Sequence, residues 1–436
     1  MKIRSLIVSL CICSISWSQE GNRITIRSLE EAISLATDRN LTLTMNELQL
    51  ERARMELKLA KSAIKPQISG SFTGQKNLEL PTTFVPGELF GQPGETVAAQ
   101  FGQEYQYTAG VTVNKSLIDL SNRLSIKERT KDIDIVASDN AIYREYLIGH
   151  ISYSYHSLLL AEEAMLLAQE DIQVADSVFQ ITQSKFDEGL LDLGALNRSK
   201  VNFNRVKQDL DEAILVYEDS QKTLKEALGI AHHKTLSLSE KLTLNGFEVP
   251  TTESLGANLE ILKSEQQTEK AALGLKQARS EYYPKISLTS YFGSQLFQDE
   301  FDFSLSHENW SPVQYASLSV NVPIFNGFST RRKVKIAKLD AEVSELNFKQ
   351  EKDRLEAEDA LLLKNQNLTA SMALTSLENY QLHKEIVALE FSKYTEGLVG
   401  LEIYLNAFED YLNAKSVYLN ALTTYYQYNA KVYSRS

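Results

Sequence analysis

The sequence contains very little cysteine: only Cys11 and Cys13 occur among its 436 residues. Both lie in an N-terminal segment with the features of a secretory signal, in which Lys2 and Arg4 precede an apolar core too short to span a bilayer. Residues 1–18 are therefore predicted to be a signal peptide, and the mature chain to contain no thiol. Neither cysteine follows the small residue of a lipoprotein signal, so lipidation is not predicted.

Motifs for catalysis and for metal binding are also missing. The six histidines show no H-x-x-x-H or H-E-x-x-H spacing, and there is no G-x-S-x-G, G-x-G-x-x-G or P-loop motif. We therefore expect no enzymatic activity, no cofactor and no bound metal ion. A formal net charge of −12 makes the chain a poor candidate for nucleic-acid binding.

After the signal segment, no run of about 18 apolar residues is present, so a membrane-inserted form would have to use β-strands. Two segments alternate apolar and polar side chains, which is typical of strands with one apolar face. Each is preceded by another predicted strand and a loop. The four predicted strands are 67–73, 105–114, 285–292 and 316–322, and the loops between them are 77–104 and 293–312.

Four strands are too few to close a barrel, and open strand edges are not tolerated in lipid. Outer-membrane barrels begin at about eight strands, so at least two chains would have to contribute, and three would give about twelve strands. The alternative is a small soluble sheet packed on helices; the signal segment and the missing helical span favour the barrel. Basic clusters follow the second and fourth strands, where they either contact anionic lipid headgroups or form a solvated helix face. They comprise Arg123, Lys127, Arg129, Lys131, Arg331, Arg332, Lys333, Lys335 and Lys338.

Long helical segments occupy most of the remaining sequence. Up to residue 186, bulky residues recur every seven positions beside a second series of mostly small residues, which predicts a coiled-coil seam with close helix approach. Such a helix is roughly 100 Å long. The first series is Ile151, Leu158, Met165, Ile172, Phe179 and Phe186, and the second is Leu147, Ser154, Ala161, Ala168, Ala175 and Thr182. A stripe at Tyr404, Tyr411, Tyr418 and Tyr425 is interpreted as packing rather than as a cofactor site.

The two halves of the chain share one pattern, which predicts an internal duplication. The turn sequence at 393–398 matches that at 185–190. A first helix is predicted to begin at Ser28 with an S-x-x-E capping box and to continue until Pro66 ends it. The predicted domains are the signal peptide 1–18, a first repeat 19–229, a linker 230–256 and a second repeat 257–436. Each repeat contains a helix, two barrel strands and a long helical hairpin.

Several of these features carry a resemblance to a known family. Residues 322–327 read VPIFNG, which is similar to the P-[IL]-F-x-G segment that precedes a long helix in TolC-like outer membrane efflux proteins. Pro323 would end the strand ladder, and Gly327 would permit the bend into the helix. The turns at Gly189 and Gly397 also resemble those of the family, and the resemblance covers essentially the whole mature sequence.

The resemblance implies a mixed fold of α-helical coiled-coil hairpins and a transmembrane β-barrel. It implies a homotrimer with four strands per protomer, whose barrel of about twelve strands contacts outer membrane lipid and whose long helical barrel occupies the periplasm. The implied function is the exit duct of a tripartite efflux pump that passively exports small molecules or drugs. Its partners would be a periplasmic adaptor and an inner-membrane transporter of the RND or ABC type. A type I protein-secretion channel is the alternative, and a secreted coiled-coil adhesin or structural fibre is a remote one.

The hairpin tips are the functional site that the resemblance implies. Six residues match tip positions and are predicted to contact the adaptor and pack the aperture: Gly189, Leu190, Leu193, Gly397, Leu398 and Leu401. Asp192, Glu396 and Glu402 would make the tips acidic if several chains meet there, or are simply solvated. The family often places aspartates just past the second tip glycine. Ile403 and Asn406 occupy the matching positions, which puts a cation-binding gate in doubt.

Overall fold

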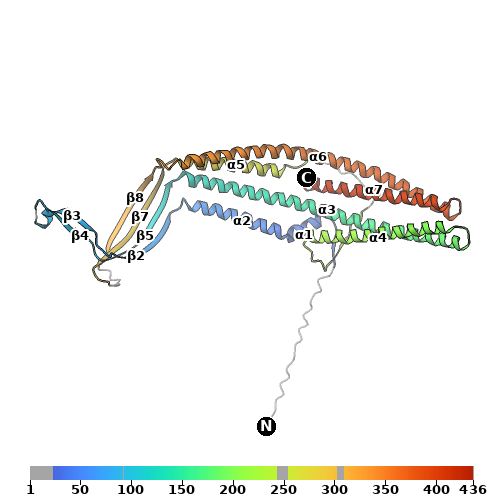
Figure 1. The fold of residues 1–436 in the computed structure, drawn as a ribbon, viewed down its shortest axis with the longest axis horizontal. Coiled ribbons are helices and arrows are strands. Elements are labelled where there is room, and N and C mark those ends of the chain that lie inside the picture. Colours follow the sequence, from blue (N-terminus) through green and yellow to red (C-terminus); the bar gives the residue numbers. More distant parts are fainter. Residues whose placement is uncertain (1–22, 92, 243–253, 302–308, 436) are drawn as a thin grey trace, which may run out of the picture. The chain divides into compact units, whose positions relative to one another are not determined.

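The computed structural model describes residues 23–91, 93–242, 254–301 and 309–435. The predicted signal peptide 1–18 and residues 243–253 of the predicted linker lie outside them. The helices are α1 (Leu29–Arg39), α2 (Leu41–Ser62), η1 (Gly87–Phe90, a 3-10 helix), α3 (Leu120–Asp187), α4 (Leu193–Ala227), α5 (Leu259–Ser280), α6 (Ser329–Thr395) and α7 (Leu401–Tyr433) (Figure 1). The strands are β1 (Arg23–Ile26), β2 (Gln67–Lys76), β3 (Thr82–Pro86), β4 (Thr96–Gln100), β5 (Tyr105–Ile118), β6 (Thr235–Leu238), β7 (Lys285–Gln298) and β8 (Ser311–Asn321). Within these residues, no helix combines the length and the apolarity needed to cross a membrane.

Two compact units divide the chain, and each is assembled from segments that are distant in sequence. Unit 1 comprises Met1–Met45, Ala141–Asn258 and Glu356–Ser436, and unit 2 comprises Asn46–Asn140 and Leu259–Leu355. The helices α3 and α6 each pass from one unit into the other. Each unit contains segments from both halves of the chain, so the two units do not correspond to the two predicted sequence repeats. The repeats stay a prediction.

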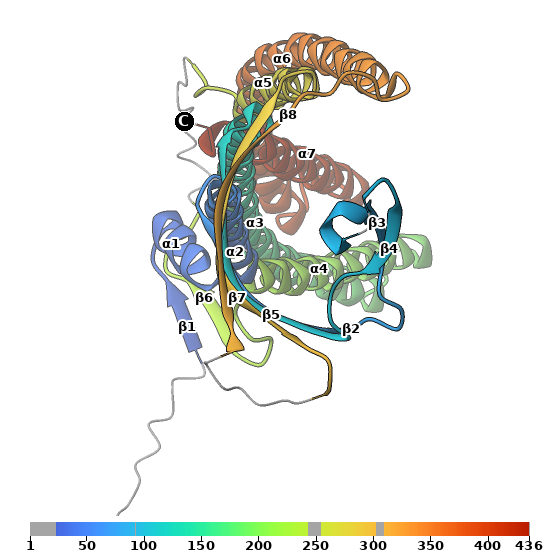
Figure 2. The same ribbon diagram turned by 90° about the vertical axis from the view of Figure 1, so that its left-hand side faces the viewer.

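Unit 2 contains a four-stranded antiparallel sheet in the order β2–β5–β7–β8. Its strands run side by side in both ribbon views (Figures 1 and 2). All four predicted strands are confirmed, and all are longer than predicted, with β5 and β7 reaching 14 residues each. Large apolar side chains such as Phe72, Phe292 and Leu318 are exposed on this sheet.

The first predicted helix is interrupted. Its capping box is confirmed at Ser28, whose hydroxyl oxygen accepts a hydrogen bond from the Glu31 amide at 3.3 Å. The expectation of one continuous helix as far as Pro66 is wrong, because Asn40 separates α1 from α2. The Asn40 side chain accepts a hydrogen bond from the Leu43 amide at 3.0 Å and so caps the next helix.

Two further sheets form where the sequence predicted irregular chain. Inside the predicted loop 77–104, β3 and β4 pair as an antiparallel hairpin. Inside the predicted linker, β6 pairs in parallel with β1. These strands have only four or five residues, too few for an alternating pattern to stand out. The β1–β6 pairing in addition joins segments that are far apart in the chain.

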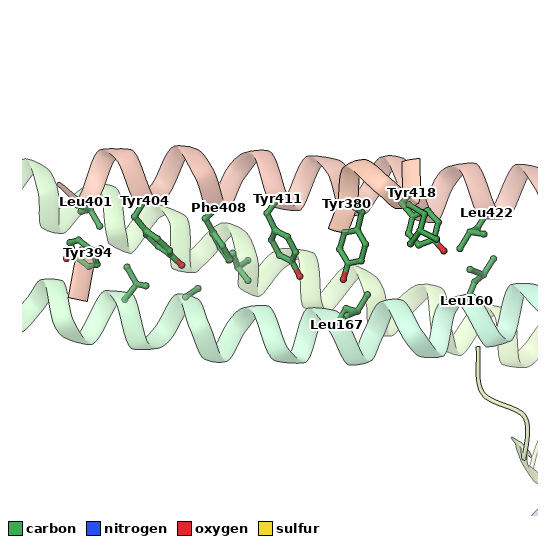
Figure 3. Packing of buried hydrophobic residues seen from close by; sticks show 14 of the residues in the cluster. Leu160, Leu167, Tyr380, Tyr394, Leu401, Tyr404, Phe408, Tyr411, Tyr418 and Leu422 are labelled. Carbon is green, nitrogen blue, oxygen red and sulfur yellow. The ribbon is translucent and has the colours of Figure 1, made fainter. Parts of the chain in front are cut away.

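Unit 1 has two hydrophobic clusters, and the larger one lies between α3, α4, α6 and α7. The small-residue series on α3 is buried from Ser154 to Thr182, whereas Met165, Ile172 and Phe179 of the bulky series are only half-buried. The tyrosine stripe on α7 is confirmed as packing, since all four of its rings are buried. Figure 3 shows labelled members of this core in one row between the helices: Tyr404, Phe408, Tyr411, Tyr418, Leu422, Tyr380, Leu160 and Leu167.

The helices of unit 2 are joined mainly by polar contacts. Ion pairs connect α3 to α5 at Lys131–Glu269 (2.6 Å), Asp132–Lys270 (2.7 Å) and Asp139–Lys263 (2.6 Å). In the predicted basic clusters, Lys131 pairs in this way, Arg129 pairs with Glu56 of α2 (3.5 Å), and Lys333 pairs with Glu281 (2.9 Å). These three cations have carboxylate partners within unit 2.

Candidate functional site: the helical hairpin tips

The first predicted tip is the turn between α3 and α4. The Gly189 amide donates to the Phe186 carbonyl at 2.9 Å, and the Leu190 amide donates to the Lys185 carbonyl at 2.8 Å. This pair of bonds is a Schellman motif, which requires a left-handed residue after the helix. Gly189 supplies it with a φ of +76°, because glycine has no Cβ to oppose that conformation.

The second tip, between α6 and α7, repeats this geometry. The Gly397 amide donates to the Tyr394 carbonyl at 3.1 Å, and the Leu398 amide donates to the Lys393 carbonyl at 2.8 Å. Gly397 has a φ of +79°. The sequence match between 185–190 and 393–398 therefore corresponds to the same backbone turn.

The four tip leucines fall into two groups. Leu190, Leu193 and Leu398 are 68 %, 59 % and 70 % exposed, so each presents a free apolar surface. Leu401 is only 5 % exposed and belongs to the aromatic core of unit 1. The structure thus separates three side chains that are open to a partner from one that packs beneath the second turn.

The three acidic residues of the tips also differ from one another. Asp192 is the N-cap of α4, and its carboxylate accepts a hydrogen bond from the Ala195 amide at 2.7 Å. Glu396 accepts a bond from the Ser392 hydroxyl at 3.4 Å. Glu402 is exposed in the first turn of α7, whose N-cap residue offers no side-chain hydrogen bond. Its charge is favourable there because the N-terminus of a helix carries partial positive charge.

Polar contacts that the sequence analysis missed join the two hairpins near the tips. The Thr182 hydroxyl lies 2.9 Å from the Tyr394 hydroxyl, and the Lys185 ammonium donates to the Tyr394 carbonyl at 3.2 Å. The same ammonium lies 4.3 Å from the centre of the Tyr394 ring, a cation–π distance. The sequence signal was that both residues fall on seven-residue series, since Tyr394 ends a second series formed with Ala373, Tyr380 and Val387.

A buried charged cluster lies deeper in the same interface and was also missed. Asp171 of α3 forms an ion pair with Lys415 of α7, and the Tyr411 hydroxyl donates to the Asp171 carboxylate at 3.1 Å. The two charged side chains are only 6 % and 12 % exposed. Burial raises the pKa of Asp171, and the neighbouring ammonium opposes that shift.

The predicted strand-to-helix turn lies between β8 and α6. Pro323 follows the end of β8 by two residues, and Gly327 has a φ of +65° just before α6 begins. Its counterpart in the first half has neither Pro nor Gly. There Asp119 caps α3 instead, accepting hydrogen bonds from the amides of Ser121 (2.9 Å) and Asn122 (3.3 Å). The two strand-to-helix connections are therefore made by different local structures, a Pro/Gly turn in the second half and an aspartate cap in the first.

No group of three or more His, Cys, Asp or Glu side chains could hold a metal ion within the part of the chain that the structure describes. The carboxylates of the two tips are engaged in capping and in local hydrogen bonds, or stand in solvent. The chemistry that the tips offer is therefore apolar contact surrounded by negative charge.

Long helical hairpins attached to a four-stranded sheet define a class, the TolC-like fold of outer membrane channels, and the predicted fold class is confirmed. The structure is similar to that of CusC, with a TM-score of 0.78 and 16 % identity over 93 % of this chain and 91 % of that one. It is also similar to the Campylobacter jejuni CmeC outer membrane channel, with a TM-score of 0.76 and 19 % identity over 100 % and 93 % of the two chains.

Sequence comparison identifies the family. A family model described as outer membrane efflux protein matches residues 32–230. The probable outer membrane lipoprotein SilC of Salmonella typhimurium is 22 % identical over 73 % of this chain and 66 % of its own length. The cation efflux system protein CusC of Escherichia coli O157:H7 is 21 % identical over 76 % and 69 %. The matches span about two thirds of the length of these relatives. Residues 32–230 therefore match the outer membrane efflux protein family, and the predicted resemblance is confirmed.

Proposed function

We propose that this protein is an outer membrane channel that forms the exit duct of a tripartite efflux pump. The observation that carries the proposal is the four-stranded sheet of unit 2. Among the described strands, β2 and β8 each have a neighbour on one side only, and side chains such as Ile68, Phe72 and Leu318 are exposed. In lipid, such edges are satisfied only when strands of further copies close the barrel.

The helices of unit 2 support assembly from several copies. Exposed apolar residues lie at coiled-coil spacing on α2 at Leu48, Met55 and Leu59, and on α6 at Ile336, Leu339, Val343 and Leu346. Residues at this spacing form the seam between two helices. We therefore expect α2 of one protomer to pack against α6 of the next in a homotrimer.

The tips support a role in docking. Leu190, Leu193 and Leu398 offer apolar surface for a periplasmic adaptor, while Leu401 acts by holding the second turn on its core. The adaptor would connect the channel to an inner-membrane transporter of the RND or ABC type. On this proposal the signal peptide 1–18 directs export, the helices lie in the periplasm, and the sheet meets outer membrane lipid.

The cargo is proposed as a small molecule or drug. Because one relative is named a cation efflux system protein, cations are a second class of cargo to be tested. A type I protein-secretion channel would instead release a polypeptide. No described residue favours that alternative, so it enters only as an outcome of the test.

The first experiment is membrane fractionation followed by native mass spectrometry in detergent. We expect a trimer from the outer membrane, and deletion of the gene should increase sensitivity to drugs or metal cations. A water-soluble monomer would contradict the proposal. Loss of one secreted protein from the medium, with unchanged sensitivity, would favour protein secretion instead.

Assembly can be tested separately with a matched pair of variants on α2. Leu59→Glu places a charge in the exposed seam, and we expect it to abolish the trimer because an unpaired carboxylate is costly in an apolar interface. Lys58→Glu places the same side chain one residue away, outside the seam, and should leave the trimer intact. Equal trimer yields from the two variants would rule out this seam as the interface.

A further inference from the structure

Two surfaces of unit 1 repeat with the same period. On α3, the buried series Ser154, Ala161, Ala168, Ala175 and Thr182 recurs every seven residues. On α7, Tyr404, Tyr411, Tyr418 and Tyr425 do the same. The two helices run antiparallel, since Asp171 contacts Tyr411 while His156 stacks on Tyr426 at 4.3 Å. Sliding one helix by seven residues, about 10 Å, would bring similar surfaces together again.

The charged contacts between these helices do not repeat. After a slip of seven residues in either direction, Asp171 would face Phe408 or Leu422 in place of Lys415. A tyrosine hydroxyl would still be available, because Tyr404 or Tyr418 would take the place of Tyr411. The carboxylate would therefore keep a hydroxyl partner and lose its ammonium.

The slip is equally unfavourable for the cation. Lys415 would face Ala164 or Val178 instead of Asp171, and its ammonium would lie in apolar surroundings. An unpaired charge in a buried site is strongly destabilising, even though a buried ion pair adds little net stability over an apolar pair. The pair thus discriminates between registers more than it stabilises the correct one.

A second charged contact lies where α7 ends. Arg435 binds Glu145 of α3 at 3.3 Å and also Asp359 of α6, where one guanidinium nitrogen donates to the carboxylate at 2.9 Å. Its side chain is 11 % exposed. A slip of seven residues would place Ser138 or Ser152 opposite Arg435 instead of Glu145. Lys415 therefore lies within the aromatic stripe, between Tyr411 and Tyr418, and Arg435 lies beyond its C-terminal end.

We propose that Lys415 and Arg435 fix the axial register of α7 against α3, which the aromatic stripe by itself leaves undetermined. Register matters at the tips, because α3 leads into the Gly189 turn and α7 begins just after the Gly397 turn. A slip of seven residues would displace Leu398 relative to Leu190 by about 10 Å. The two exposed leucines would then no longer lie at matching positions along the helix axes.

The test measures the register directly by electron paramagnetic resonance between two spin labels. Both cysteines of the sequence, Cys11 and Cys13, lie in the predicted signal peptide. In the mature chain, Ser177→Cys on α3 and Ser416→Cys on α7 therefore give two unique labelling sites. Both are exposed, and they are offset along the helices, so slips in opposite directions change the distance with opposite sign. Labelled chains are diluted with unlabelled chains to isolate distances within one protomer.

Two variants separate the cations from the aromatic stripe. The triple variant Asp171→Leu, Lys415→Met, Arg435→Gln removes both cations and keeps every tyrosine. We expect it to show a second distance, shifted by up to about 10 Å. Tyr418→Leu weakens the stripe and keeps the cations, and we expect it to retain a single native distance despite its lower stability.

Two results would overturn the proposal. One is a single native distance in the triple variant, which would assign the register to the continuity of the chain through the Gly397 turn. The other is a second distance in Tyr418→Leu. If the triple variant does not fold, the test compares the spin-label distances of two other variants. One is the swapped pair Asp171→Lys, Lys415→Asp, and the other is Lys415→Met alone. The swapped pair must then restore the single distance that Lys415→Met loses, and failure to restore it would also overturn the proposal.

Discussion

The two compact units differ in where their apolar side chains lie. In unit 1 the helices enclose aromatic residues, and Tyr404, Tyr418 and Tyr425 are at most 1 % exposed. In unit 2 the helices are joined by exposed ion pairs, and the apolar residues of α2 and α6 face outward. Unit 1 therefore carries its own core, whereas unit 2 has apolar surface that remains to be covered.

This difference indicates where stability comes from. A buried aromatic side chain contributes several times more than an exposed ion pair, because solvent and salt screen the pair. Unit 1 should then be stable within one chain, and unit 2 should gain its stability on assembly. The variants that follow test this contrast, and local opening in each unit can be followed by hydrogen exchange.

The largest effect is expected from the core of unit 1. Tyr418→Ala removes a ring that stacks on Tyr380 at 5.7 Å, and we expect a loss of about 3–5 kcal/mol in the free energy of unfolding. Val417→Ala, at a position that is 58 % exposed, should change it by less than about 0.5 kcal/mol. Denaturant unfolding measures both, and similar losses in the two variants would contradict the assignment of the core.

A smaller effect is expected when a glycine is replaced in each unit. Gly397→Ala forces a residue with a Cβ into a φ of +79°, which should cost about 1–2 kcal/mol. In unit 2, a Cβ at Gly274 of α5 would meet no atom within 4 Å, so Gly274→Ala should stabilise the helix by up to about 1 kcal/mol. Thermal unfolding in detergent compares the two. Destabilisation by Gly274→Ala would indicate that another chain lies against α5.

The ion pairs of unit 2 should contribute less still. Lys131→Met removes the contact to Glu269, and we expect a loss below about 1 kcal/mol. Raising the salt concentration should reduce the difference between this variant and the unaltered protein, because exposed charges are screened. A loss that is large and independent of salt would mean that the pair is buried in the assembled protein.

The most gradual effect is expected from pH. Burial lowers the pKa of His156 below its ordinary value of 6.5, and its ring stacks on Tyr426 in unit 1. Below pH 6.5 the unfolded chain takes up a proton that the folded chain does not, so stability should fall as the pH falls. Unfolding between pH 7.5 and 5 should show this decrease, and His156→Phe should reduce it. His233→Gln, at an exposed position, serves as the control, and an equal reduction there would exclude His156 as the cause.

Much of the secondary structure could be predicted because its side-chain patterns repeat over long segments. The alternation from Tyr105 to Asn114 predicted β5, and the seven-residue series predicted α3 and the buried tyrosines of α7. The tip turns were located from glycines that follow matching helix ends. The break at Asn40 was missed because apolar residues continue on both sides of it, so the periodicity alone gave no sign that the helix ends.

The functional role of the tips is still a prediction, and the structure sharpens it. Leu190 and Leu398 are open to a partner, whereas Leu401 is buried. Sequence position alone could not separate them, since all three are leucines beside a turn. Whether a leucine beside a tip turn faces the core depends on how the opposing hairpin packs against that turn.

By itself, the sequence determined the long helices, the amphipathic strands and the glycine turns, because each is encoded by side chains that are close together in the chain. Only the tertiary structure decided that β1 pairs with β6, that Asp171 meets Lys415, and that Thr182 meets Tyr394. Each of these contacts joins residues more than 200 positions apart. A repeating pattern shows which face of a segment is apolar, but the partner of that face is chosen by packing and by the cost of leaving a charge unpaired.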